Sequence, residues 1–167
     1  MSLPLQSTSI PARRSVAEIE AMLEGVGFSR TMSVRDGTER RVYAAHKGAE
    51  LEFGIDVERV VKAMIDDASR NKQQHIRKGT TQGKGWLEDI REQAERVGWR
   101  LLREHVKAQC DSVKLGVVTI AEAFAGQLLL KGPRGPVRLA SVVTMAIEEG
   151  TFNSPRLMNQ LMITGPK

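Results

Sequence analysis

The residues with the clearest chemical potential form a basic segment that contains no acid. The fifteen residues from Arg70 to Lys84 include five Lys or Arg side chains and no Asp or Glu. A segment without carboxylates cannot neutralise its own charge, so its cations are available to an anionic polymer. The sequence therefore predicts a phosphate-binding segment whose contact residues are Arg70, Lys72, Arg77, Lys78 and Lys84.

A second group of cations follows at helical spacing further along the chain. Its members are separated by four, three and four positions, which places them on one face of a helix. Such a face can follow a nucleic-acid backbone. It can equally be an ordinary solvated surface, because Glu92 and Glu104 can form pairs with some of these cations at four-residue spacing. Both interpretations stay open for Arg96, Arg100, Arg103 and Lys107.

Catalysis is not indicated by any motif. The stretch 79–84 is one residue too short for a phosphate-binding loop of the Walker type, and Gly85 replaces the hydroxyl residue that should follow Lys84. None of the three histidines lies three or four positions from another, and the chain has a single cysteine, so no zinc site is evident. We therefore expect a protein that is not an enzyme and has no cofactor and no metal.

The composition is that of a globular chain rather than a membrane protein. Of 167 residues, 27% are charged and only 4% are aromatic, with a net charge of +5. The core must then consist of Val, Leu, Ile, Met and Ala, which suits helix packing. No apolar run approaches the roughly 20 residues that span a bilayer, and the N-terminus lacks the apolar region of a signal peptide. We expect no membrane contact and a cytoplasmic location.

The first half of the chain predicts a small α+β unit over residues 15–69, preceded by a disordered leader over 1–14. Ser15 and Glu18 match a capping box that opens a helix to about residue 24. Short alternating segments between 28 and 55, separated by turns at Asp36-Gly37 and Lys47-Gly48, indicate three antiparallel strands. Asp56 then caps an amphipathic helix that extends to Ala68.

The second half predicts a helical unit over residues 86–167, joined to the first by a flexible linker over 70–85. A long helix from 86 to 115 carries an apolar seam from Leu87 to Val113, and Gly98 can permit the close approach of another element. A second capping box at Thr119 and Glu122 opens a helix through Leu130. A turn at 131–136, a helix over 137–149 and a short helix over 155–162 complete an α+β fold.

Three stretches resemble a family of small uncharacterised proteins of bacteriophages and prophages. They are Ser15–Gly27, Trp99–Leu102 followed by Val106–Phe124, and Lys131–Gly135. The sequence departs from the family pattern at Gly54-Ile-Asp-Val and lacks an Asp-Gly turn near Lys131. The resemblance implies a viral origin, a location in the bacterial host cell and a role in phage DNA metabolism, but no activity.

Two functions follow from these observations. The first is a non-enzymatic accessory protein that binds the phosphate backbone of DNA or RNA through the basic segment and the basic helix face. The alternative is a protein-interaction module, either an inhibitor of a host enzyme or a subunit of a larger complex. It would use the apolar seam of the long helix, against a host protein or a second copy in a homodimer.

Overall fold

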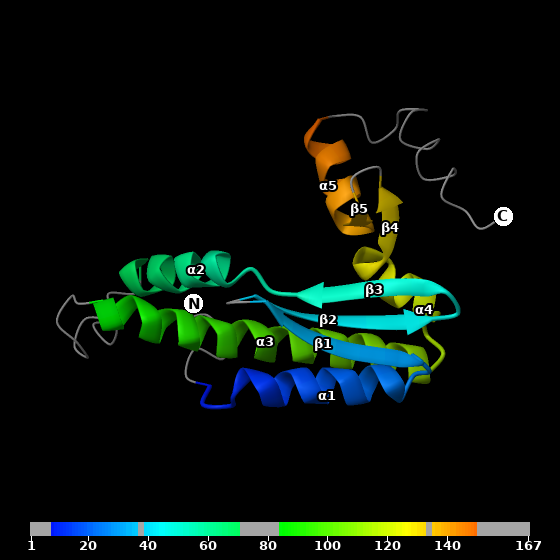
Figure 1. Ribbon diagram of the computed structural model, residues 1–167, viewed down its shortest axis with the longest axis horizontal. Coiled ribbons are helices and arrows are strands. Elements are labelled where there is room, and N and C mark those ends of the chain that lie inside the picture. The colour runs from blue at the N-terminus through cyan, green and yellow to red at the C-terminus, as the bar shows by residue number, and fades with distance from the viewer. Residues whose placement is uncertain (1–7, 37–38, 71–83, 133–134, 150–167) are drawn as a thin grey trace.

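The predicted α+β fold is confirmed in the computed structural model, which describes residues 8–36, 39–70, 84–132 and 135–149. Its main body is a three-stranded sheet with helices along one side, from which a hairpin and a helix stand out (Figure 1). The elements are α1 (Ala12–Glu24), β1 (Arg30–Asp36), β2 (Glu39–His46), β3 (Ala49–Gly54), α2 (Val57–Arg70), α3 (Lys84–Lys114), α4 (Ile120–Phe124), the 3-10 turn η2 (Ala125–Gln127), β4 (Leu129–Gly132), β5 (Gly135–Arg138) and α5 (Leu139–Glu148).

The sheet is the antiparallel meander that the sequence predicts, in the order β1-β2-β3. Lys47 and Gly48 have φ angles of 48° and 84°, as the tight turn between β2 and β3 requires. The register pairs Asp36 with Glu39, so Asp36, which the sequence assigned to the first turn, belongs to β1. Because side chains alternate along a strand, Val42 and Ala44 of β2 point to the helix-covered face together with two residues of β3, Leu51 and Phe53.

One hydrophobic core joins both halves of the chain. Ile19 of α1 and Phe53 of β3 are buried in the same cluster as Trp99 and Val106 of α3. The aromatic rings of Phe28 and Phe53 each meet that of Phe124 edge-on, at centroid distances of 5.4 Å and 6.0 Å. The predicted linker at 70–85 therefore does not separate two independent cores, because α3 lies along α1 and under the sheet.

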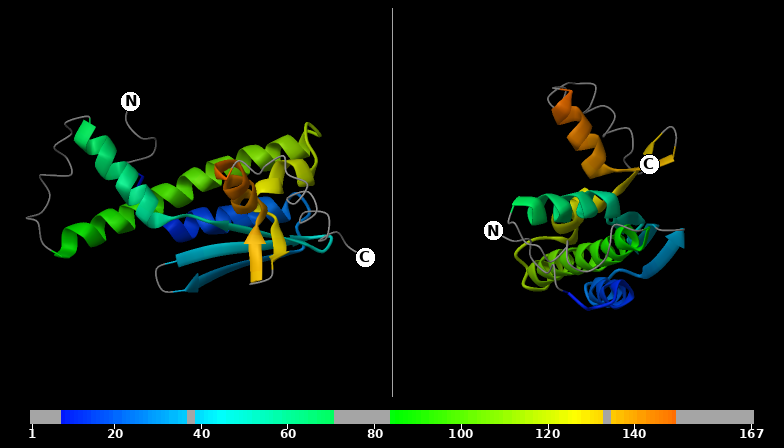
Figure 2. Two further views of the ribbon diagram at one scale, coloured as in Figure 1. Left: turned by 90° about the horizontal axis from the view of Figure 1, so that it is seen from above. Right: turned by 90° about the vertical axis from the view of Figure 1, so that its left-hand side faces the viewer.

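Helix α2 lies across α3 and forms a second, smaller core with it (Figure 2). Asp56 caps α2 as predicted, because its carboxylate accepts a hydrogen bond from the backbone N–H of Arg59 at 3.0 Å. Val61 and Met64 then pack against the apolar face of α3. Where α3 passes the end of β3, Gly98 provides the close approach that was expected, since a Cβ there would lie 2.7 Å from Cδ1 of Ile55.

The predicted capping box at Ser15 is wrong. Helix α1 begins three residues earlier, after Pro11, and Ser15 is fully buried inside it with no cap hydrogen bond. The hydroxyl faces the core instead of the helix end, so it cannot accept from a free N–H. Of the predicted leader, residues 1–7 lie outside the described part, whereas 12–14 are helical. The carbonyl of Thr8 accepts a hydrogen bond from Nε2 of Gln93 at 3.0 Å.

The second capping box is confirmed, but the helix it opens is short. Thr119 and Glu122 make both reciprocal hydrogen bonds, yet α4 ends at Phe124 rather than at Leu130. Leu128 forms a bridge with Leu51 at the edge of β3, and the hairpin β4–β5 follows where a helix end and a turn were predicted. Pairing with β3 thus overrides the local helical pattern. Helix α5 is present as predicted but begins at Leu139, because Val137 and Arg138 belong to β5. The short helix over 155–162 lies outside the described residues.

Candidate nucleic-acid interface

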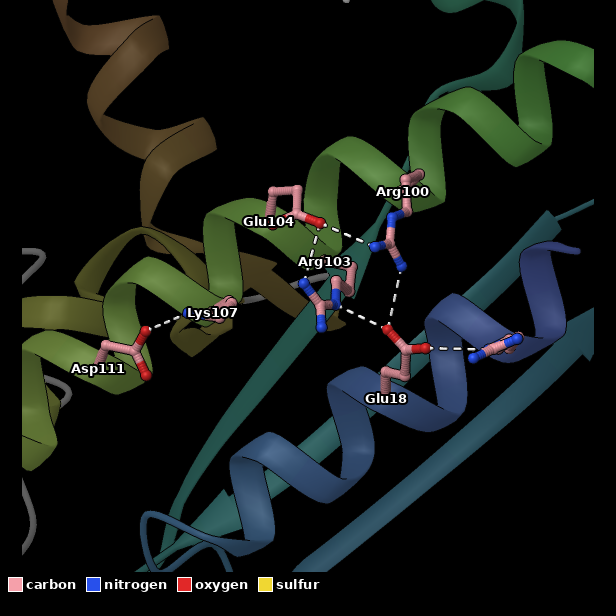
Figure 3. Close-up of polar contacts among 7 residues, drawn as sticks. Glu18, Arg100, Arg103, Glu104, Lys107 and Asp111 are labelled. Carbon is pink, nitrogen blue, oxygen red and sulfur yellow. Dashed lines mark hydrogen bonds and ion pairs between the residues drawn. The ribbon is translucent and has the colours of Figure 1, made fainter. Parts of the chain in front are cut away.

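The basic helix face (Arg96, Arg100, Arg103 and Lys107) lies on α3. Figure 3 shows its last three residues, of which Arg100 and Arg103 meet a carboxylate of α1. Glu18 of α1 is the central partner. Its Oε2 accepts a hydrogen bond from Nη1 of Arg100 at 3.1 Å and another from Nε of Arg103 at 2.8 Å. The side chains of Arg100 and Arg103 are only 18% and 19% exposed, so these contacts fix them between the helices.

Further contacts extend the same network on both helices. Glu104 lies 3.2 Å from Arg100 and 2.9 Å from Arg103, and Arg14 reaches the other oxygen of Glu18 at 3.2 Å. Partial burial acts to raise the pKa of Glu18, but the hydrogen bonds from Arg14 and Arg103 and the charges of both α3 arginines outweigh it. The net pKa of Glu18 is therefore below its ordinary value, which marks it as an ionised structural partner.

The two ends of the basic helix face are paired along the helix itself. Arg96 contacts Glu92 at 2.5 Å, and Lys107 contacts Asp111 at 2.6 Å. The hydrogen bond from Lys107 lowers the pKa of Asp111. All four cations of this face thus have a carboxylate partner. The sequence identified two of these acids, Glu92 and Glu104. It could have shown Asp111, four positions from Lys107, whereas Glu18 lies more than 80 positions away and only the packing of α1 on α3 reveals it.

Only the two ends of the basic segment belong to elements that the structure describes. Arg70 is the last residue of α2 and Lys84 is the first of α3, and their side chains, like the whole of Lys72, Arg77 and Lys78, lie outside the described part. The two helices diverge toward these ends, away from the sheet (Figure 2). The predicted binding residues therefore fall into two groups. One is the ion-paired helix face, and the other is the segment that connects the end of α2 to the start of α3.

The apolar seam of α3, on which the alternative function depends, is largely used within the chain. Ile90, Ala94 and Val97 pack against α2, while Val106 and Cys110 are buried with α1 and the sheet. Leu87 and Leu101 are the seam residues that stay exposed, at 47% and 37%. A partner protein would therefore need a different apolar surface.

Within residues 8–36, 39–70, 84–132 and 135–149, no group of three His, Cys, Asp or Glu side chains is arranged to hold a metal ion. No helix in this described part is long and apolar enough to cross a membrane. No protein-family model, curated protein or solved structure matches the chain. The resemblance to the phage family stays a prediction that these comparisons do not test.

Proposed function

We propose that this protein is a non-enzymatic accessory protein that holds the phosphate backbone of DNA or RNA through the basic segment, residues 70–84. The observation that carries the proposal is the segment's five cations and absence of carboxylates, set between the ends of two packed helices. Cations whose charge is not balanced locally gain most from releasing the counterions of a nucleic acid.

The basic helix face has a supporting rather than a binding role in this proposal. Recruiting Arg100 or Arg103 to a phosphate would break contacts with Glu18 that join α1 to α3. A carboxylate left without its partners beside an incoming phosphate would oppose binding. We therefore assign backbone contact to Arg70, Lys72, Arg77, Lys78 and Lys84, and structural ion pairing to the basic helix face.

The test compares two variants with equal net charge. One replaces Lys72, Arg77, Lys78 and Lys84 with Ala. The other replaces Arg13, Lys47, Arg59 and Lys62, which are exposed on other surfaces, with Ala. Each loses four charges from the +5 of the chain and so has +1. Fluorescence anisotropy with labelled single- and double-stranded DNA and RNA, at low and moderate salt, should show loss of binding for the first variant only. Equal loss in both, or no binding at low salt, would contradict the proposal.

A second candidate, a subunit of a larger protein complex, is favoured by one specific surface. Helix α5 has no charged side chain before Glu148, and Met145 and Ile147 on it are 56% and 61% exposed. With the β4–β5 hairpin it stands away from the main body (Figure 1). Exposed apolar side chains on a helix of this kind are typical of protein contacts.

This candidate predicts an association that is insensitive to salt. Affinity capture from a bacterial lysate should retain one protein on the wild-type chain that is absent when Met145→Glu/Ile147→Glu is used. Ser141→Glu, an exposed position on the same helix, is the matched control. The identified protein must then bind the purified wild-type chain directly. A captured set that is identical for all three chains would rule the candidate out.

A further inference from the structure

Strand β1 is an edge strand with little support from its own chain. Among the described residues it pairs with β2 on one side only, and six of its seven residues are exposed. In contrast, β2 and β3 each bury alternate residues under the helices. The opposite edge of the sheet, at β3, is partly occupied by the bridge to Leu128. Figure 1 shows β1 on the side of the sheet away from the β4–β5 hairpin.

A strand beside the helices is expected to turn its apolar side chains toward them, but β1 does the opposite. The pairing register puts Thr31 and Ser33 on the helix-covered face, beside Val42 and Ala44 of β2. Its apolar residues, Met32 and Val34, point to the opposite face and are 56% and 40% exposed. An exposed edge with apolar side chains invites pairing with another strand, unless charges oppose it.

The charges of β1 do not oppose pairing with an identical strand. In an antiparallel pair centred on Ser33, positions whose numbers add to 66 lie opposite each other. Arg30 then faces Asp36 of the other copy at both ends, and Met32 faces Val34 on the same side of the sheet. This register matches all seven residues and keeps the apolar side chains together, which other centres do not.

Asp36 has an unfavourable neighbour directly opposite it in its own sheet. It lies opposite Glu39 in the β1–β2 register, and like charges in that position are unfavourable. Among the described residues, neither Arg30 nor Asp36 forms an ion pair. A second copy would provide the missing cation at Asp36 and the missing anion at Arg30.

We infer that two copies of this chain associate through antiparallel pairing of their β1 strands about a two-fold axis at Ser33, which forms one six-stranded sheet. Each copy offers one such edge, so the assembly closes at two and does not grow into a fibre. Pairing of a single strand buries less area than a standard stable interface, so the dimer is weak and its population depends on concentration.

Sedimentation equilibrium of the full chain tests this inference by charge exchange. Arg30→Asp alone and Asp36→Arg alone each create two like-charge pairs in a homodimer, and each should weaken self-association at least about tenfold. An equimolar mixture of the two variants restores both opposite pairs, so it should form a heterodimer at about wild-type strength. The double variant should self-associate again. Arg13→Asp, at an exposed position on α1, should have no effect.

Circular dichroism of each variant checks that it is folded. A wild-type chain that stays monomeric up to about 1 mM would overturn the inference. So would a dimer that both single reversals leave unchanged, or a mixture that fails to associate although its components are folded. The test is independent of nucleic-acid binding, because no substituted residue belongs to the basic segment.

Discussion

The carboxylate of Glu18 accepts a hydrogen bond from Nε of Arg103 at 2.8 Å, which ties the first helix to the middle of the longest one. The two residues are 85 positions apart in the chain. With the contact of Arg100 to the same carboxylate, it shows that two cations of α3 serve the packing of two helices. A basic face that looks available in a helical projection is, in the folded chain, already occupied by acids.

The pKa of Glu18 makes that contact measurable. Because the pKa is lowered from 4.5 in the folded state, the unfolded chain takes up the proton first as the pH falls. The stabilisation is therefore complete above about pH 4.5 and is lost as the pH falls through the folded-state value. Glu18→Gln should cost about 1 kcal/mol or less near neutral pH, because the network is partly exposed. Urea unfolding should show this difference from the wild type shrinking in acid; a difference that does not depend on pH would contradict the prediction.

Replacing cations of the basic segment and replacing cations of the basic helix face should have different effects on the salt dependence of nucleic-acid binding. Replacing Lys72, Arg77, Lys78 and Lys84 with Ala should reduce the slope of log affinity against log salt by up to about 4 on duplex DNA. Arg100→Gln should lower thermal stability and leave the slope unchanged, because its charge serves the contacts with Glu18 and Glu104. Titration at several salt concentrations gives both slopes. An equal reduction of the slope for Arg100→Gln would mean that the basic helix face also contacts the nucleic-acid backbone.

The two capping boxes that the sequence suggests should respond differently to the loss of their hydroxyl. Thr119→Ala removes a cap that is present in the structure, and we expect a loss of about 1 kcal/mol. Ser15→Ala removes a buried hydroxyl that makes no hydrogen bond to the described residues, so stability should be unchanged or slightly increased. Denaturant unfolding of both variants checks the pair. A comparable loss for Ser15→Ala would mean that its hydroxyl has a partner.

Gly98 and Ile55 should be energetically coupled. Gly98→Ala improves helix propensity by up to about 1 kcal/mol, but the new Cβ meets Cδ1 of Ile55. Ile55→Val removes that methyl group, so Gly98→Ala should be more favourable in the Ile55→Val background by about 1 kcal/mol. A double-mutant cycle of unfolding free energies measures this. Simple additivity would show that the side chain of Ile55 turns aside without cost.

Cys110 should be nearly inert while the chain is folded. The residue is 1% exposed, and burial raises the pKa of its thiol, so little thiolate is present and reagents cannot reach it. A thiol reagent should modify it only on unfolding, at a rate that rises with urea. Ala108→Cys in a Cys110→Ala background places a thiol on the exposed side of the same helix and should react quickly. Rapid modification of native Cys110 would indicate local opening of α3.

Local sequence signals determined most of the elements of this protein. Alternation and turn residues predicted the three strands, and helical spacing predicted α2, α3 and α5, because these patterns depend on residues close together in the chain. The cap at Thr119 was predicted for the same reason. The core shared by both halves of the chain was not predicted, since it requires α1, the sheet and α3 to meet across long separations.

Tertiary structure decided the partners of each surface. It turned Ser15 toward the core, placed Glu18 among the arginines of α3, and drew residues after Phe124 into a hairpin beside β3. Each of these outcomes depends on a contact between distant segments, whose energy no local pattern records. The sequence by itself determined that residues 70–84 contain no acid, because this is a property of composition. Which charges are neutralised depends on folding, since only then do distant acids and bases come within a few ångströms.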